Sequence, residues 1–148
     1  MNLKPHPSGC LLVLEDSDED FDTILAAAKE SNLKNEIIRV TNGDECVQLL
    51  EKRAQEDATF SPLLALFDLN TPQGDGRYAL KTLRGNARYK TLPIVILITS
   101  ENRHDLEFCY HAGANAYHTK SVSYPAHVRT VRQIFEYWLD GVILPFAQ

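Results

Sequence analysis

The sequence predicts a doubly wound α/β domain, with a five-stranded parallel sheet and helices on both faces. Short, continuously apolar segments alternate along the chain with segments whose apolar residues recur at helical spacing. Continuous apolar runs are typical of parallel strands that are buried on both faces, whereas a sheet with one solvated face shows alternation. The expected strands are residues 11–14, 36–40, 63–67, 94–98 and 116–119.

Turn and capping residues delimit the helices between these strands. Ser17 and Asp18 follow the first strand and are suited to cap a helix, and residues 41–43 (Thr-Asn-Gly) close the second strand. The apolar residues that mark the first two helices are Phe21, Ile24, Leu25 and Ala28, then Cys46, Val47, Leu49 and Leu50. Residues 54–61 are expected to be irregular.

The second half of the chain repeats this pattern three times. A helix over residues 75–83 is expected after a loop that contains Pro72, Gly74 and Gly76. A fourth helix, marked by Leu106, Cys109 and Tyr110, is expected to end at Gly113, and Pro125 suits the first turn of the last helix. The apolar stripe of that last helix is Val128, Val131, Phe135, Trp138 and Leu139.

Composition limits the function classes. The 148 residues are 44% hydrophobic and 24% charged, which is typical of one globular domain, with a core over about residues 9–140 and a tail over 141–148. A net charge of −5 disfavours binding to nucleic acid or to an anionic membrane. No apolar run approaches the roughly 20 residues that span a bilayer. The three cysteines, Cys10, Cys46 and Cys109, are widely spaced and form no C-x-x-C pair. We therefore expect reduced thiols and a cytoplasmic protein.

Charged residues gather where three of the strands end. Glu15 and Asp16 follow the first strand, Asp68 the third and Lys120 the fifth. Ligands of open parallel sheets bind beyond the carboxyl ends of the strands, so these side chains are expected to converge. Carboxylates packed together favour an oxygen-ligated cation such as Mg²⁺. Asp68, beside metal and lysine, is suited to attack phosphorus and form an aspartyl-phosphate.

Each of these residues also has a purely structural interpretation. Glu15 and Asp16 suit the acidic first turn of a helix, Asp68 suits a turn, and Lys120 suits a solvated strand end. Their combination at one sheet edge favours the functional interpretation. The scattered histidines are interpreted as surface residues: His6, His104, His111, His118 and His127.

Two segments give the chain a family resemblance over nearly its whole length. Residues 66–77 (LFDLNTPQGDGR) resemble the phosphoacceptor loop of two-component response regulator receiver domains, which have a flavodoxin-like fold. Residues 135–139 (FEYWL) with Leu144 and Pro145 resemble the C-terminal signature of the single-domain regulators that partner cyanobacterial phytochromes.

The resemblance implies a role for each matching residue. Asp68 is expected to accept the phosphoryl group, and Lys120 to contact it. The expected Mg²⁺ ligands are the carboxylates of Glu15, Asp16 and Asp68 and the backbone carbonyl of Asn70. Residues 114–120 match the segment that holds the switch aromatic, here Tyr117, while Pro72 and Gly76 are expected to shape the loop.

The chain departs from the family at the end of the fourth strand. Receivers usually carry a Ser or Thr there, whereas counting from Asp68 or Lys120 places Ile98 at this position and Thr99 one residue late. Because successive strand side chains point to opposite faces, Thr99 is expected to point away from the site unless a bulge restores the register. Ser121 stands where many receivers have a cis-proline.

We therefore expect a stand-alone response regulator that is not an enzyme toward other molecules. It would take a phosphoryl group from a sensor histidine kinase of the phytochrome type, and the apolar last helix and tail suggest a homodimer through the C-terminal helix region. Two alternatives stay open. Ile98 suggests a pseudo-receiver that only binds proteins, and residues 68–71 resemble the nucleophile loop of haloacid-dehalogenase-type phosphatases. That family usually has a second Asp where this chain has Asn70.

Overall fold

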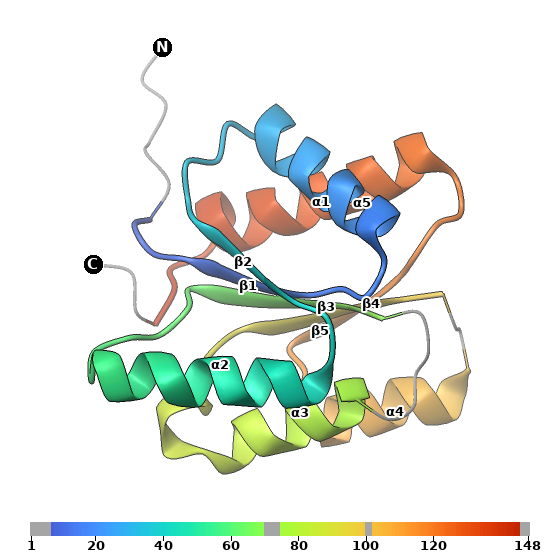
Figure 1. Cartoon of the computed structure of the whole chain (residues 1–148). Helices are drawn as coiled ribbons and strands as arrows, with labels where there is room; N and C mark the ends of the chain where they lie inside the picture. The colour runs from blue at the N-terminus through green and yellow to red at the C-terminus, as the bar shows by residue number, and fades with distance from the viewer. Residues whose placement is uncertain (1–6, 70–74, 100–101, 146–148) are drawn as a thin grey trace.

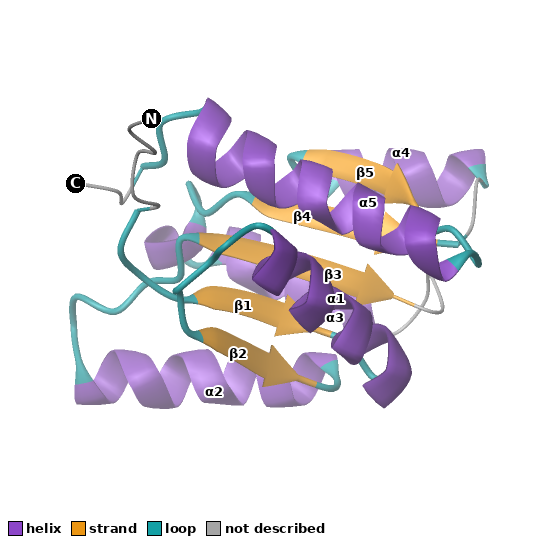
Figure 2. Cartoon of the chain, turned by 90° about the horizontal axis from the view of Figure 1, so that it is seen from above, coloured by secondary structure: helices purple, strands orange, loops and turns teal. Residues whose placement is uncertain are grey.

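The computed structural model describes residues 7–69, 75–99 and 102–145, and its centre is a five-stranded parallel sheet. The strand order is β2-β1-β3-β4-β5, and the arrows of Figure 2 all point to one edge. The strands are β1 (Leu11–Leu14), β2 (Ile37–Val40), β3 (Leu64–Leu69), β4 (Ile94–Ile98) and β5 (Ala116–Thr119). The predicted fold class is confirmed. At the strand boundaries, β2 excludes Glu36, and β3 excludes Leu63 and extends past residue 67 to Leu69.

Helices cover both faces of the sheet, as the sequence predicts (Figure 1). α1 (Asp18–Glu30) and α5 (Tyr124–Phe135) lie on one face. α2 (Gly43–Glu56), α3 (Asp75–Gly85) and α4 (Arg103–His111) lie on the other. The doubly wound arrangement follows from the parallel strands, because each pair needs a crossover helix and the sheet must be buried on both sides.

The side chains of the sheet divide between two apolar cores, one on each face. Along β3, Leu64 and Leu66 belong to the core under α1 and α5, whereas Ala65 and Phe67 belong to the core under α2, α3 and α4. This alternation is the period of a strand. It continues to the end of the strand, where the side chain of Asp68 is due on the α1/α5 face.

Local signals in the sequence set several helix ends. The Ser17 hydroxyl accepts a hydrogen bond from the backbone N–H of Asp20 at 3.3 Å and caps α1. The Asn42 side chain caps α2 in the same way, through the N–H of Glu45 at 2.8 Å. Gly113 follows α4 with a φ of +108°, so the predicted glycine C-cap is confirmed.

Three features of the backbone differ from expectation. α2 extends to Glu56, into a segment expected to be irregular, and a short 3₁₀ helix η1 (Ala87–Tyr89) precedes β4. After α5 the chain continues as a π-helical segment η2 (Glu136–Gly141). In this segment Leu139 is buried, whereas Trp138 is only partly buried.

All three cysteines are buried and free, in line with the expected reduced thiols. Within the residues that the structure describes, no helix combines the length and the apolar character needed to cross a membrane.

Candidate phosphoacceptor site

Asp68 lies at the carboxyl end of β3 and is fully buried, with 0% of its surface exposed. It pairs in register with Leu97 of β4, so the central strands of the sheet fix its position. A buried carboxylate is costly unless charged or hydrogen-bonding groups surround it. The groups around Asp68 therefore decide what this position can do.

Lys120 supplies the positive charge at Asp68. It directly follows β5, where its backbone N–H donates to the Ile98 carbonyl at 2.7 Å. Its Nζ lies 2.7 Å from Asp68 Oδ1, 2.5 Å from Asp20 Oδ2 and 3.7 Å from Glu15 Oε2. Burial lowers the pKa of Lys120, but the carboxylates of Asp20 and Asp68 outweigh it, and the net direction is upward. The lysine is therefore held in its charged form among the three acids.

Glu15 is the second fully buried acid of the site. One of its oxygens, Oε1, accepts a hydrogen bond from the Ser17 N–H at 2.9 Å. Burial, together with the neighbouring Asp68 carboxyl, raises the pKa of Glu15 to about 9. Burial beside a second carboxyl therefore favours the protonated form of Glu15 in the metal-free site.

This excess of carboxylate oxygen fits a divalent cation. Glu15 Oε2 and both oxygens of Asp68 are buried without a complete hydrogen bond, and hard oxygen donors are what Mg²⁺ binds. Asp16, the other predicted carboxylate ligand, is exposed at the end of β1, and Asn70 lies outside the described residues. Among the described residues, no group of three acidic, His or Cys side chains is arranged around a cation position.

The strand that carries Ile98 is regular to its end. Ile98 pairs with Leu69 of β3 and with Thr119 of β5, so no bulge shifts the register. Its side chain is fully buried in the core under α2, α3 and α4, against which Tyr117 packs as a partly buried side chain. Thr99 follows the strand and is exposed. Ile98 is therefore the last residue of β4 without a bulge, and the assignment of the switch position stays a prediction.

The structure adds two residues that the sequence analysis did not place in the site. His127, interpreted as a surface residue, is only 3% exposed, and its Nε2 lies 3.3 Å from Asp68 Oδ2, so that interpretation was wrong. Asp20 joins through Lys120. Both residues lie near the N-termini of helices that follow sheet strands. Helices of this kind begin at the edge where the strands end, which places both residues near the site but does not fix where their side chains point.

The other described histidines agree better with the surface interpretation. His104 and His111 are exposed on α4, and His118 on β5 is half-buried. His6 and Pro72 lie outside the described residues.

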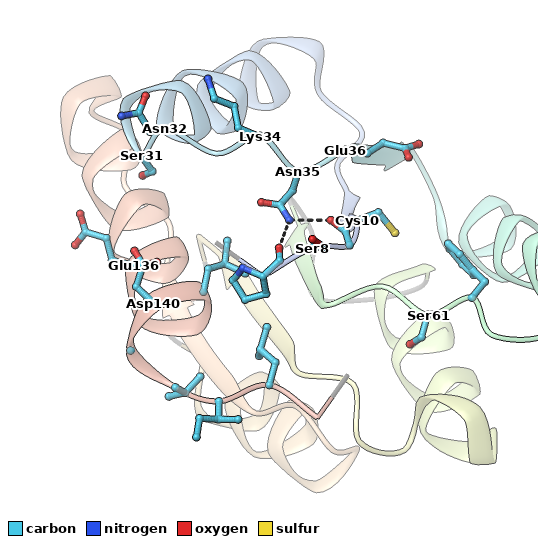
Figure 3. A pocket seen from close by; sticks show the side chains of 18 of the residues that line it. Ser8, Cys10, Ser31, Asn32, Lys34, Asn35, Glu36, Ser61, Glu136 and Asp140 are labelled. Atoms are coloured by element: carbon cyan, nitrogen blue, oxygen red, sulfur yellow. Dashed lines mark hydrogen bonds between the residues drawn. The ribbon is translucent and has the colours of Figure 1, made fainter. Parts of the chain in front are cut away.

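A large cavity lies away from this site. A hollow of about 1450 Å³ opens at the opposite edge of the sheet, between the start of the described chain, the α1–β2 connection and residues 136–144 (Figure 3). Asn35 crosses part of it and donates to the carbonyls of Pro7 at 2.7 Å and Gly9 at 2.8 Å. None of the predicted site residues lines this hollow. The cavity and the buried charged groups around Asp68 therefore lie at different ends of the sheet.

Comparison with known proteins agrees with this geometry. No protein-family model matches the chain. The response regulator Rcp1 of Synechocystis sp. is 32% identical over 147 residues, which cover 99% of this chain and 100% of that protein. The crystal structure of the phosphorylated cyanobacterial phytochrome response regulator RcpA is similar with a TM-score of 0.83 and 31% identity, over 93% of this chain and 99% of RcpA. The Mn²⁺-bound form of Rcp1 gives a TM-score of 0.82 and 32% identity, over the same shares of the two chains.

Full-length similarity, the strand order and the buried acids beside a lysine point the same way. The fold is that of the receivers, and the sequence identity extends over the whole of a curated response regulator. The chain belongs to the response regulators and is homologous to the phytochrome response regulators of cyanobacteria.

Proposed function

We propose that this receiver accepts a phosphoryl group on Asp68 from the phosphohistidine of a sensor kinase. The observation that carries the proposal is the contact of 2.7 Å between Lys120 Nζ and Oδ1 of the fully buried Asp68. In the transfer, a carboxylate oxygen attacks phosphorus, and the electron pair of the P–N bond returns to the kinase imidazole. Lys120 neutralises charge on the phosphoryl oxygens as a point charge. The protein's own contribution is positioning and charge neutralisation.

The transfer is proposed to depend on Mg²⁺, held by Glu15, Asp16 and Asp68 with the backbone carbonyl of Asn70. When bound, the ion would neutralise negative charge on the carboxylates and on the phosphoryl group. The unsatisfied oxygens of Glu15 and Asp68 support these residues as ligands. Rcp1, at 32% identity, has a structure in a Mn²⁺-bound form, which is consistent with a divalent cation in this family.

The proposed partners are a phytochrome-type histidine kinase and a second copy of this chain, in the cytoplasm. The similarity to RcpA and Rcp1 supports the kinase class. Exposed apolar side chains after α5 support self-association through the C-terminal helix region, since Tyr137 is 57% and Ile143 95% exposed. Phosphoryl transfer to Asp68, and its loss from it, are proposed to be the only chemistry.

The test is phosphoryl transfer from a radiolabelled phytochrome-type kinase, in Mg²⁺ and in chelator. Wild-type protein is expected to take acid-stable, base-labile label only in Mg²⁺, and Asp68→Asn is expected to take none. Asp22→Asn, at an exposed carboxylate of α1, is the matched control and should label normally. Label that persists in Asp68→Asn would overturn the assignment of the acceptor.

A pseudo-receiver remains the second candidate, because Ile98 brings no hydroxyl to the strand-end position. The same experiment separates the two proposals. Absence of label on folded wild-type protein, with a kinase that labels another receiver, would favour a binding module. Rapid hydrolysis of small phosphoesters would instead favour the phosphatase alternative.

A further inference from the structure

His127 enters the site from α5. Its backbone N–H donates to the Ser123 carbonyl at 2.8 Å in the first turn of that helix, so the local backbone is fixed. The side chain is 3% exposed and points from the α1/α5 face toward the end of β3. This is the face on which the alternation of β3 places Asp68.

The two oxygens of Asp68 are approached by different groups. Lys120 Nζ is 2.7 Å from Oδ1, and His127 Nε2 is 3.3 Å from Oδ2. Within the described ranges, these are the two basic side chains in ion-pair contact with Asp68. Each oxygen of the carboxylate therefore lies in a distinct environment.

Nε2 of His127 is buried and has no complete hydrogen bond among the described residues. Buried polar atoms are nearly always satisfied, so an unsatisfied one that faces a reactive group needs an explanation. Contacts that serve a reaction are often long or poorly aligned in the resting protein and tighten when the reactants bind. The contact of 3.3 Å between His127 Nε2 and Asp68 Oδ2 is long in this way.

We propose that His127 is a positioning residue for phosphoryl transfer to Asp68, an inference that rests on the function proposed above. Its Nε2–H holds Oδ2, which leaves Oδ1, beside Lys120, as the oxygen that attacks phosphorus. A bond forms between Oδ1 and phosphorus, while the bond from phosphorus to the donor breaks and its electron pair leaves with the donor. His127 neither gives nor takes a proton in this step.

The proposal also accounts for the strand-end isoleucine. Ile98 offers no hydrogen-bond donor at the position where the resemblance implies a hydroxyl. A donor on α5 orients the carboxylate from the opposite face of the sheet. Transfer to Asp68 would then depend on α5 rather than on the end of β4.

The experiment compares three variants by rate of labelling with acetyl phosphate and Mg²⁺. His127→Leu removes the donor, His127→Gln keeps an amide N–H near the Nε2 position, and His127→Asn has an amide too short to reach Asp68. Misplacement of a reacting group by about 1 Å costs roughly a hundredfold in rate, so a tenfold to hundredfold loss is expected for Leu and Asn. The loss should appear at saturating donor, with the half-saturating donor concentration unchanged, and Gln should restore most of the rate.

A second readout reports the contact without any phosphoryl donor. The imidazole ¹⁵N resonance of His127 in the metal-free protein should shift in Asp68→Asn. His118→Leu, at a half-buried histidine of β5, is the matched control and should label like wild type. If the His127→Leu variant does not fold, the labelling rates of His127→Gln and His127→Asn decide whether His127 is a positioning residue. A merely structural role would not separate these two rates.

The outcomes distinguish this inference from the function beneath it. A labelled wild type with equal rates in Gln, Asn and Leu overturns the role of His127 and leaves the proposed function intact. A wild type that takes no label from either donor overturns both. A Gln variant that labels while Asn and Leu do not supports the positioning role.

Discussion

Glu15 links the stability of the metal-free site to pH. Its pKa in the folded protein is about 9, against an ordinary value of 4.5, because it is buried next to Asp68. A group whose pKa is raised by folding stabilises the fold below its ordinary pKa, and that stabilisation is lost as the pH rises toward the folded value. In chelator, the stability contributed by Glu15 should therefore fall between about pH 4.5 and pH 9.

The variant Glu15→Gln isolates this effect, because glutamine is neutral throughout. The difference in melting temperature between Glu15→Gln and wild type should grow with pH in chelator, in favour of the variant, and shrink when Mg²⁺ is added. Glu51→Gln, at an exposed position on α2, should follow wild type at every pH. Parallel profiles for wild type and Glu15→Gln, measured by thermal unfolding, would mean that Glu15 is ionised in the resting site.

Ile98 is the residue at which we expect stability and signalling to move in opposite directions. Ile98→Thr removes buried methyl groups and adds a buried hydroxyl, so the resting protein should lose about 1–3 kcal/mol of unfolding free energy. If the hydroxyl reaches a phosphoryl oxygen on Asp68, it adds a hydrogen bond to a charged acceptor, and the phosphorylated form should live longer.

Ile96→Thr is the matched control, since Ile96 lies in the same core, on the same face of β4, and is equally buried. Both variants should lose similar stability in urea unfolding, but only Ile98→Thr should slow the loss of label from Asp68. Equal label lifetimes in the two variants would remove Ile98 from the strand-end switch position.

Sequence alone placed Glu15, Asp68 and Lys120 correctly, because each follows an apolar strand and parallel strands end at one edge. It missed His127 because a lone histidine on an amphipathic helix carries no spacing signal. Its inward direction depends on how α5 packs on α1 and β3, and only the tertiary structure provides that. Asp20 was missed for the same reason, since its role depends on the reach of Lys120.

At the scale of elements, Arg84 ties α3 to the turn after α4. Its guanidinium donates to the Gly113 carbonyl at 2.8 Å, the Tyr89 carbonyl at 2.7 Å and Asn115 Oδ1 at 2.7 Å. Asn115 in turn accepts from the N–H of Ile94, at the start of β4. Burial lowers the pKa of Arg84. Among the described residues, backbone and amide oxygens accept its hydrogen bonds.

Arg84→Met should therefore lower the free energy of unfolding by about 2–4 kcal/mol, because hydrogen bonds to a charged group contribute roughly 1.5–3 kcal/mol each and several are lost together. Arg103→Met, which removes an exposed ion pair with Glu107 within α4, should cost less than about 0.5 kcal/mol. Chemical denaturation measures both. A small loss for Arg84→Met would mean that water replaces its partners, and phosphoryl transfer should be unchanged in either variant.

The elements themselves were predictable to the extent that local chemistry sets them. The side chains of Ser17 and Asn42 cap the first turns of α1 and α2. Gly113 follows the end of α4 with a positive φ, which glycine adopts readily. The π-helical segment after Phe135 was not predictable, since its apolar residues also fit an ordinary helix. Which spacing is adopted depends on the fit of Leu139 and Leu144 into the core under α1 and α5.

For the whole molecule, the two faces of the sheet have different tasks. The α1/α5 face carries Asp20 and His127 to the acidic site and also leads into the tail, where Leu144 is buried but Ile143 is 95% exposed. The α2–α4 face holds Ile98 and Tyr117.

At the scale of the whole molecule, the testable property is self-association through the C-terminal helix region. An exposed isoleucine that becomes buried in an interface contributes about 1.5–3 kcal/mol, and a buried unpaired charge in its place costs more. Ile143→Asp should therefore weaken the dimer at least roughly tenfold, measured by equilibrium sedimentation with and without phosphorylation.

Tyr78→Asp serves as the control, because Tyr78 is 47% exposed on α3, on the opposite face of the sheet from α5. It should leave the dimer constant unchanged if the interface lies at the C-terminal helix region. Equal weakening by both substitutions would place the interface elsewhere or indicate non-specific association. Wild-type protein that stays monomeric at high concentration, phosphorylated or not, would remove self-association altogether, and the α5 surface would then be available to the kinase or to a downstream protein.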